Sequence, residues 1–428
     1  MRDIYAVTWV TYAHATYAMI DSMAGYPLYV LTVNAGSSSL KAALFFMESP
    51  IASAERMFEC VIADIGEPQA DITFQSSDGS ESKEVTYIKD HSSAIELFTV
   101  RLSTVVSLTS IDAVGYRIVH GGSAFSEATV ITDDVVSELR KLMPLDPQHA
   151  PVEQELIQLL RQKLPEATHV ACFDTAFFHD IPRVAQIVPI PRTYEALGVR
   201  RYGFHGLSYT YLKSAFEAHA GVQAVNGRVV YAHLGNGVSL AATNNGKAID
   251  MTMGFTPTSG VMMGSRSGDL DPEIAHFLTH NSQMSIDDFT HMVGFEAGLL
   301  GVSGLSSDMY TLLQARDENP QANEAIELFC YQVKKAIGSL ATTIGGIDSL
   351  IFSGGMGEQA PYIRQRICDG LEFLGILIDD SANQRHEFLI SNAAATVGVH
   401  VIPTDESEVI RQQVGDTLAS LSTGGQYE

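Results

Sequence analysis

The sequence is poor in cysteine, tryptophan and positive charge. Its 428 residues include four cysteines and one tryptophan, and 26 Lys and Arg stand against 50 Asp and Glu, for a formal charge of −24. A chain this acidic repels nucleic-acid phosphates and anionic lipid, so neither is an expected partner. An arginine placed beside an anionic ligand is therefore conspicuous.

The four cysteines are far apart and show no C-x-x-C spacing, which argues against a zinc site and against a disulfide framework. We expect buried thiols in a reducing cytoplasm. No stretch has the roughly 18 uninterrupted apolar residues that a membrane helix needs. The expected location is cytoplasmic.

The first 27 residues differ in character from the rest. The stretch "AVTWVTYAHATYAMI" is apolar like the core of a signal peptide, but it contains Thr, Tyr and His, and only Arg2 supplies positive charge before it. We expect a poorly ordered extension over residues 1–27, or translation from Met23, with export as the alternative.

The remaining chain alternates short β-rich runs with helical patterns, which predicts an α/β architecture of two domains. The segments "VLTVNAGSSSLKAALF" (30–45) and "RVVYAHLGNGVSLAATNNGKAID" (228–250) share one layout: a strand, a loop of small residues and a second strand. Asn245 and Gly246 are typical of a tight hairpin turn. The shared layout predicts a duplicated domain.

Loops of this composition suit an oxyanion. Glycine permits dihedral angles that turn successive N–H groups toward one point, although a Gly-Ser turn is often only a turn. A third element, "LIFSGGMGEQAPYIRQRI", joins a strand to a helix expected to begin near Pro361. Its glycines allow the close approach of a nucleotide, or simply tight packing. The first loop is not a Walker P-loop, because Gly36 is not followed by Gly-Lys-Ser at the needed spacing and the chain continues as a strand.

Polar residues at the ends of apolar runs are the candidate catalytic groups. Arg117 and Arg266 can each hold a carboxylate or phosphate through two hydrogen bonds. Asp174 ends a strand, where it can bind magnesium or orient a nucleophile. Three histidines can donate to a phosphoryl oxygen or be structural: His149, His205 and His233.

These residues lie in motifs that resemble those of the acetate kinases. In chain order the motifs are "VNAGSSSLK", "YRIVHGG", "FDTAFF", "RRYGFHGLS", "HLGNGVS", "MGFTPTSGVMMGSRSGDLDP", "GLLGVSGLSSDM", "FSGGMGE" and "VIPTDESEVI". The resemblance runs from about Tyr29 to the C-terminus. It implies a duplicated, two-lobed ribonuclease H-like fold, as in actin-like ATPases, with a cleft between the lobes. The lobes would comprise residues 28–177 with 405–428, and residues 178–404, the second binding nucleotide and forming a homodimer.

The resemblance also implies a role for each candidate. The catalytic set is Asn34, Arg117, Asp174, His205 and Arg266, with transition-state support from His149, His205 and Arg266. The substrate pocket is Val119, Gln148, Phe204 and Pro257, and the metal ligands are Asn34 and Glu406. The nucleotide site is Lys41, His233, Leu234, Gly235, Asn236, Gly237, Asp308, Met309, Tyr310, Gly354, Gly355, Met356, Gly357 and Glu358. Ser37 and Ser39 fall in the same motif as Asn34 and Lys41.

The implied reaction is reversible phosphoryl transfer between ATP and acetate, giving acetyl phosphate and ADP, with Mg²⁺ or alternatively Mn²⁺. A carboxylate oxygen attacks the phosphorus in line, so catalysis consists of alignment and charge stabilisation. Two arginines, a histidine and a metal ion meet that need.

Several departures from the family pattern leave alternatives open. Gln148 stands where the family motif "PLHNP" has Leu, so propionate and butyrate are alternatives to acetate. Tyr310 replaces an Arg near the adenosine and Met356 an Ile, so pyrophosphate is the alternative donor. A non-enzymatic nucleotide switch of the actin or chaperone kind is the alternative of a different class, but a switch has no use for two acyl-orienting arginines.

Overall fold

The computed structural model describes residues 27–36 and 38–424, which form two compact units. The first unit contains the described residues up to Asp174 together with 406–424, and the second is Thr175–Asp405. The predicted N-terminal extension up to residue 26, and Ser37 of the first loop, lie outside the described residues.

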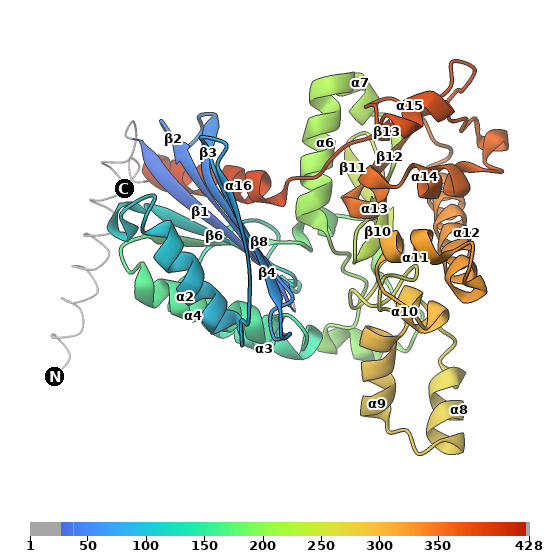
Figure 1. Ribbon diagram of the computed structural model, residues 1–428, viewed down its shortest axis with the longest axis horizontal. Coiled ribbons are helices and arrows are strands. Elements are labelled where there is room, and N and C mark those ends of the chain that lie inside the picture. Colours follow the sequence, from blue (N-terminus) through green and yellow to red (C-terminus); the bar gives the residue numbers. More distant parts are fainter. Residues whose placement is uncertain (1–26, 37, 425–428) are drawn as a thin grey trace. The chain divides into compact units, whose positions relative to one another are not determined.

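An eight-stranded sheet forms the centre of the first unit, in the order β5-β4-β3-β2-β1-β6-β8-β7. Its strands are β1 (Leu28–Ala35), β2 (Leu40–Met47), β3 (Ala54–Ala63), β4 (Ala70–Ser76), β5 (Glu81–Thr86), β6 (Ala113–Ile118), β7 (Thr129–Val130) and β8 (Thr168–Phe173). Its helices are α2 (His91–Leu102), α3 (Asp133–Leu142), α4 (Ala150–Lys163) and α16 (Glu406–Gly424). Helix α16 packs on β6, where a Cβ added to Gly115 would lie 2.4 Å from Ile410. Helices α2 and α4 lie along the other face (Figure 1).

A five-stranded sheet forms the centre of the second unit, in the order β11-β10-β9-β12-β13. Its strands are β9 (Arg228–Leu234), β10 (Val238–Asn244), β11 (Lys247–Met251), β12 (Ser349–Ser353) and β13 (Gly398–Val401). Its helices are α5 (Arg183–Gln186), α6 (Gly206–Ala220), α7 (Val222–Val225), α8 (Glu273–Asn281), α9 (Ile286–His291), α10 (Gly298–Ser303), α11 (Met309–Ala315), α12 (Pro320–Thr343), α13 (Gly354–Gln359), α14 (Pro361–Cys368) and α15 (Asp380–Gln384). Tyr209 and Phe216 of α6 pack with Val229 and Tyr231 of β9 in one core, and α12 covers the other face (Figure 1).

The two sheets repeat one strand order. In β3-β2-β1-β6-β8 and in β11-β10-β9-β12-β13 the first three strands are antiparallel and the last two run parallel to the central strand. Each copy therefore opens on a hairpin whose first strand is the middle of the sheet. The predicted α/β class and its duplicated, ribonuclease H-like layout are confirmed.

Three local predictions, on a turn, the cysteines and a helix start, are also confirmed. Asn245 (φ 51°) and Gly246 (φ 68°) both have positive φ between β10 and β11, as a two-residue type I′ turn requires. The four cysteines are free and buried, and their burial is the first cause of thiol pKa values above the usual range. Helix α14 begins at Pro361 as expected. Across the described residues, no helix combines the length and apolar character required to span a bilayer.

One detail differs from the expectation. The glycines after β12 form a short helix, α13, instead of an open loop, because the Glu358 side chain accepts a hydrogen bond from the Gly354 backbone N–H at 2.9 Å and closes the turn. The glycines stay accessible at Gly355, which is exposed.

Candidate active site

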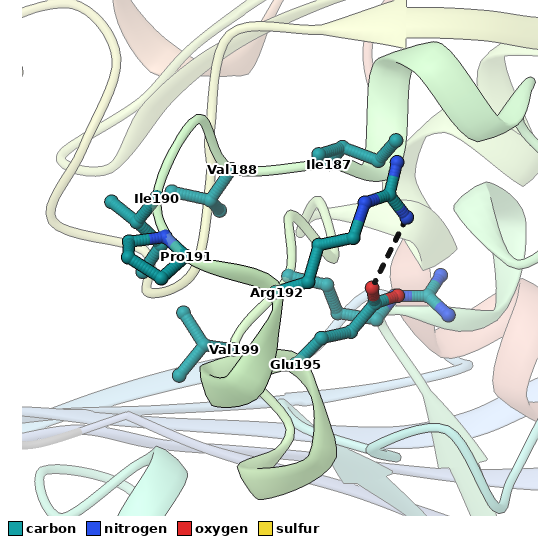
Figure 2. A pocket seen from close by; sticks show the side chains of 8 residues that line it. Ile187, Val188, Ile190, Pro191, Arg192, Glu195 and Val199 are labelled. Atoms are coloured by element: carbon teal, nitrogen blue, oxygen red, sulfur yellow. Dashed lines mark ion pairs between the residues drawn. The ribbon is translucent and has the colours of Figure 1, made fainter.

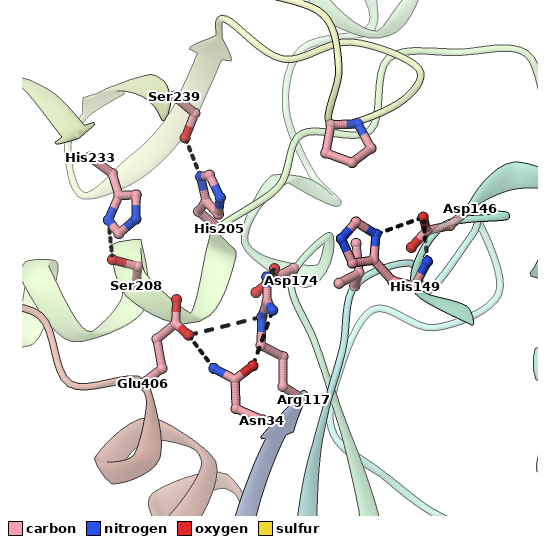
Figure 3. A network of polar contacts seen from close by, with 12 residues as sticks. Asn34, Arg117, Asp146, His149, Asp174, His205, Ser208, His233, Ser239 and Glu406 are labelled. Carbon is pink, nitrogen blue, oxygen red and sulfur yellow. Dashed lines mark hydrogen bonds and ion pairs between the residues drawn. The ribbon is translucent and has the colours of Figure 1, made fainter. Parts of the chain in front are cut away.

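Strands β1, β6 and β8 of the first unit end beside one another and bring three polar side chains together. Arg117 donates to Asp174 Oδ2 from Nε at 3.0 Å and from Nη2 at 2.6 Å. It also donates from Nη1 to Asn34 Oδ1 at 3.1 Å, and Asn34 Nδ2 donates to Glu406 Oε2 at 2.7 Å (Figure 3). This network of four residues is called the arginine network below.

The arginine network is unevenly satisfied. The Asp174 side chain is fully buried, and its Oδ1 has no hydrogen-bond partner, so one carboxylate oxygen is left for a ligand. The pKa of Glu406 is raised, first by burial; Arg117 lowers it, Asp174 raises it, and Lys41 lowers it. Lys41 reaches this position because it pairs with Asn34 across the β1–β2 hairpin.

This donor set fits a magnesium ion. Mg²⁺ prefers oxygen ligands and is commonly held by one or two carboxylates together with waters and substrate phosphates. The arginine network offers the carboxylates of Asp174 and Glu406, the first with its Oδ1 unpartnered, and the amide of Asn34. Within 27–36 and 38–424, no group of three or more His, Cys, Asp or Glu is placed to hold a metal ion.

A second buried cluster of the first unit lies at the start of α4. Asp146 Oδ1 accepts hydrogen bonds from His149 Nδ1 at 2.9 Å and from the His149 backbone N–H at 3.3 Å. One turn further on, Glu153 Oε1 accepts from the backbone N–H of Val119 at 2.8 Å, directly after β6. Gln148, between these residues, is half-buried. Helix α4 is therefore tied to the strand that carries Arg117.

Two histidines of the second unit face each other. The rings of His205 and His233 have centroids 4.6 Å apart. His205 Nδ1 is hydrogen-bonded to Ser239 Oγ at 2.8 Å (Figure 3). Ser239 is also bonded to the Tyr209 hydroxyl at 2.5 Å. His205 has φ 61°, a left-handed backbone that a non-glycine residue adopts at a cost of about 1–3 kcal/mol and that clusters at functional sites.

His233 is held by a relay of hydroxyl groups. Its Nδ1 is hydrogen-bonded to Ser208 Oγ at 2.9 Å, and Ser208 is bonded to Thr404 Oγ1 at 2.8 Å. The Thr404 backbone N–H donates to Glu358 at 3.2 Å. In both cases the hydrogen bond at Nδ1 fixes the ring and leaves Nε2 on the other side.

Arg266 and the glycine loop after β9 join the histidine pair. A Cβ added to Gly237 would lie 3.0 Å from His205 Nε2 and 3.6 Å from Arg266 Nη1, so glycine is needed for this close packing. Arg266 Nη1 donates to the Pro257 carbonyl at 3.3 Å. Phe204, beside His205 in the chain, is buried.

The predicted nucleotide residues of the second unit gather around the same loop. Gly354 (φ 75°) packs so closely that an added Cβ would lie 2.7 Å from the Leu234 carbonyl carbon and 2.8 Å from Gly235 N. A Cβ added to Gly264 would lie 2.3 Å from Asn236 Oδ1 and 3.1 Å from the Ser307 carbonyl oxygen, at the approach to α11.

These nucleotide residues differ in exposure. Asp308 caps α11 by accepting from the Thr311 N–H, Met309 is buried and Tyr310 is 70% exposed. Met356 and Glu358 are half-buried, while Gly357 is buried beneath them. A substituent at Gly355 would meet nothing within 4 Å. Gly355 and Tyr310 are thus the exposed members of this group.

The structure thus arranges the predicted residues in two sets, one in each unit. The first set is Asn34, Lys41, Arg117, Val119, Gln148, His149, Asp174 and Glu406, and the second is made up of the remaining predicted residues. Reasoning from the sequence missed the residues that hold these side chains in place: Asp146, Glu153, Ser208, Tyr209, Ser239 and Thr404. The sequence offers a signal for Asp146 and Thr404, because they lie in the motifs "DPQHAP" and "VIPTDES" beside predicted residues.

The second unit also has a surface hollow. Its empty volume is about 250 Å³, and it is lined by Ile187, Val188, Ile190, Pro191, Arg192, Glu195, Val199 and Arg200 (Figure 2). Arg192 and Glu195, on one short helix that lines it, form an ion pair at 4.0 Å. None of these eight residues belongs to the predicted site.

The sequence model of the acetokinase family matches residues 29–412 of the chain. The chain belongs to the acetokinase family. It is 40% identical over 390 residues to a propionate kinase of Salmonella typhimurium, covering 90% of this chain and 95% of the relative. It is also 40% identical over 390 residues to an acetate kinase of Rhodopseudomonas palustris, covering 90% and 97%.

Solved structures of the acetokinase family are similar throughout. An acetate kinase of Porphyromonas gingivalis superposes with a TM-score of 0.79 at 33% identity, covering 92% of this chain and 99% of that one. A propionate kinase of Francisella tularensis superposes with a TM-score of 0.83 at 33% identity, covering 90% and 98%. Relatives named for either acid are thus equally similar to this chain.

Proposed function

We propose that this protein catalyses the reversible, Mg²⁺-dependent transfer of a phosphoryl group between ATP and acetate, with acetyl phosphate and ADP as the other pair. The observation that carries the proposal is the arginine network, in which Arg117 is held by Asp174 and Asn34 beside Glu406. This is a cation with fixed geometry next to carboxylates, in a chain of net charge −24.

In the first unit, the proposal gives the arginine network the acid substrate and the metal ion. Arg117 has its Nε and Nη2 engaged by Asp174 and its Nη1 by Asn34, so its plane is set before a ligand arrives. Such preorganisation lowers the entropy cost of aligning the acetate oxygen with the phosphorus. Asn34, Asp174 and Glu406 would hold Mg²⁺, which supplies charge neutralisation for phosphate oxygens when bound.

In the second unit, the proposal gives the glycine loop and α13 the nucleotide. Arg266 and His205 supply a guanidinium and an imidazole nitrogen beside Gly237, where they would donate to oxygens of the transferring phosphoryl group. The Ser239 and Tyr209 hydroxyls keep the His205 ring in one orientation. The open surface at Gly355 would receive the adenosine.

Gln148 supports a second candidate, propionate or butyrate as the acid. The side chain is half-buried near the start of α4, one residue before His149, and is polar where the family motif has Leu. If Gln148 is what admits the longer acids, replacing it with the family's Leu is expected to lower kcat/KM for propionate and butyrate relative to acetate. A methylene group in such a pocket is worth about 1–3 kcal/mol, which corresponds to about 10–200-fold.

We also propose a cytoplasmic homodimer with neither nucleic acid nor membrane as a partner. The charge of −24 supports the second point, since phosphate surfaces repel it. The homodimer is supported by helices α8 and α9, which contain no buried residue and expose three large apolar side chains, those of Ile274, Phe277 and Ile286. Light scattering of the purified protein and of a Phe277→Glu variant tests the dimer, which the variant should weaken.

Acyl phosphate formation tests the main proposal. Purified protein with Mg²⁺ is incubated with ATP or pyrophosphate and with acetate, propionate or butyrate, and acyl phosphate is trapped as the hydroxamate. Product with ATP and acetate supports the proposal. Product that forms only with pyrophosphate would make pyrophosphate the phosphoryl donor in place of ATP. ATP hydrolysis that is indifferent to every acid contradicts the proposal and favours a nucleotide switch.

A further inference from the structure

Asp146 is a buried carboxylate that the reaction as described does not use. Its side chain is 2% exposed, and only one of its two oxygens is engaged in the described structure. Oδ1 accepts two hydrogen bonds from His149, whereas Oδ2 is buried with no partner. A half-satisfied buried carboxylate destabilises a fold, so its presence calls for a role beyond packing.

The hydrogen bond to His149 has a definite direction. The pKa of Asp146 lies below its usual value. Burial raises this pKa, but the hydrogen bonds and charge of His149, with a contribution from His120, together lower it by more than burial raises it. An ionised carboxylate can only accept, so the proton between Oδ1 and Nδ1 belongs to His149. Nε2 is then the nitrogen left for a ligand, and it is directed away from Asp146 in Figure 3.

The backbone around this pair is fixed by two further contacts. The Ala150 N–H donates to the Asp146 carbonyl at 3.1 Å, which closes the turn that starts α4. Glu153 of the same helix holds the Val119 N–H at 2.8 Å, directly after the strand of Arg117. His149 is therefore anchored both through its ring and through its helix, as a residue needs to be if it meets a ligand in one geometry.

We propose that Asp146 is a positioning residue, which holds His149 with a proton on Nδ1 and directs Nε2 toward the anionic substrate. When Nε2 also takes up a proton, the Asp146 carboxylate balances the imidazolium charge, and Nε2–H becomes a charged donor. His120 after β6 and Glu153 on α4 interact electrostatically with Asp146, and Glu153 in turn interacts with Arg117 and Asp174. This role rests on the proposed function, because the anion is that of the acyl kinase reaction.

Kinetics of three variants separate positioning from packing. Asp146→Asn keeps the shape but lets an amide donate to Nδ1, so the ring loses its fixed proton; kcat is expected to fall about 10–100-fold with little change in KM. His149→Ala should lower kcat at least as far, and the double variant no further than His149→Ala alone. Glu155→Gln, which removes an exposed carboxylate of the same helix, is the matched control. Full additivity of Asp146→Asn and His149→Ala overturns the proposal.

A spectroscopic measurement on the unaltered protein decides the question without any variant at Asp146. Nitrogen NMR of ¹⁵N-histidine-labelled protein, with the His149 signals assigned by their loss in His149→Gln, reports which ring nitrogen carries hydrogen. A proton on Nδ1 supports the proposal, and a bare Nδ1 with hydrogen only on Nε2 overturns it. Because this readout needs no turnover, a protein that lacks kinase activity would overturn the proposed function while the Asp146–His149 result still stands or falls by itself.

Discussion

Asn34 donates a hydrogen bond of 2.7 Å to Glu406, a residue 372 positions further along the chain. One residue belongs to the first strand of the first unit and the other begins its last helix, so the arginine network closes only when the C-terminal segment returns to the sheet. The amide of Asn34 serves both partners: its oxygen accepts from Arg117 and its nitrogen donates to Glu406.

Replacing Glu406 with Gln is expected to lower the affinity for Mg²⁺, so that a higher Mg²⁺ concentration is needed for the same rate. The variant keeps an oxygen for Asn34 but loses a negative charge, and loss of such a group typically lowers metal affinity or activity about 10–100-fold. The measurement is initial rate against Mg²⁺ concentration. Asp416→Asn, on an exposed part of α16, is the control and should behave as the unaltered protein. An unchanged Mg²⁺ curve for Glu406→Gln would remove Glu406 from the metal site.

Replacing Arg117 or Arg266 with Ala should lower activity in both cases but lower stability only for Arg117. Arg266→Ala is expected to lower kcat about 10²–10³-fold, as loss of one positioned donor does, with an unchanged melting temperature. Arg117→Ala should lose activity similarly and also lose about 3–5 kcal/mol of stability, because Asp174 is fully buried and would be left without its ion pair. Thermal melting and steady-state kinetics separate the two. An Arg117→Ala, Asp174→Asn double variant that regains stability but not activity would confirm the division, whereas equal melting temperatures of the two single variants would contradict it.

Gly354 and Gly355 make a matched pair. Gly354→Ala forces a Cβ to within 2.7 Å of backbone at a φ of 75°, and should lower stability by about 1–3 kcal/mol or more. Gly355→Ala enters open space, so its melting temperature should hold while the KM for ATP rises. Melting curves and ATP titrations test both. A Gly355→Ala protein with an unaltered KM would place the adenosine elsewhere.

Stability should fall as the pH rises, through Glu153. Burial, and next the charge of Asp146, raises the pKa of Glu153 to about 8 from the usual 4.5. Between these values the unfolded chain releases the proton and the folded chain keeps it. The free energy of unfolding therefore decreases with rising pH, by up to about 1.4 kcal/mol per pH unit from this group. Glu153→Gln, which keeps an acceptor for Val119 N–H, should flatten that slope in urea denaturation series, whereas Glu155→Gln should not. Parallel slopes for the two variants would contradict the assignment.

The sequence predicted those parts of the molecule that depend on neighbouring residues. Asn245 and Gly246 predict their turn because both residues accept a positive φ, and the strand-loop-strand layout predicts the two hairpins. The motifs that resemble acetate kinases named Arg117, Asp174 and Glu406, but their mutual hydrogen bonds came only with the fold.

What escaped prediction is the set of residues that act through others. Ser239 of β10 is hydrogen-bonded to His205, 34 positions earlier, and Thr404 to Ser208, 196 positions earlier. No local sequence pattern links residues so far apart. Glu153 looks like one more solvated charge on an amphipathic helix. It is buried, because the Val119 N–H after β6 has no strand partner and needs an acceptor.

The shared strand order of the two sheets has a historical meaning. A chain that repeats β3-β2-β1-β6-β8 as β11-β10-β9-β12-β13 is what tandem duplication and fusion of a half-length gene leaves behind. The loop after Asn34 and the loop after His233 then descend from one ancestral turn. The first loop reads NAGSSS from Asn34 and the second HLGNGVS from His233, so the relation between the copies is preserved in the order of the strands far better than in the residues of the two turns.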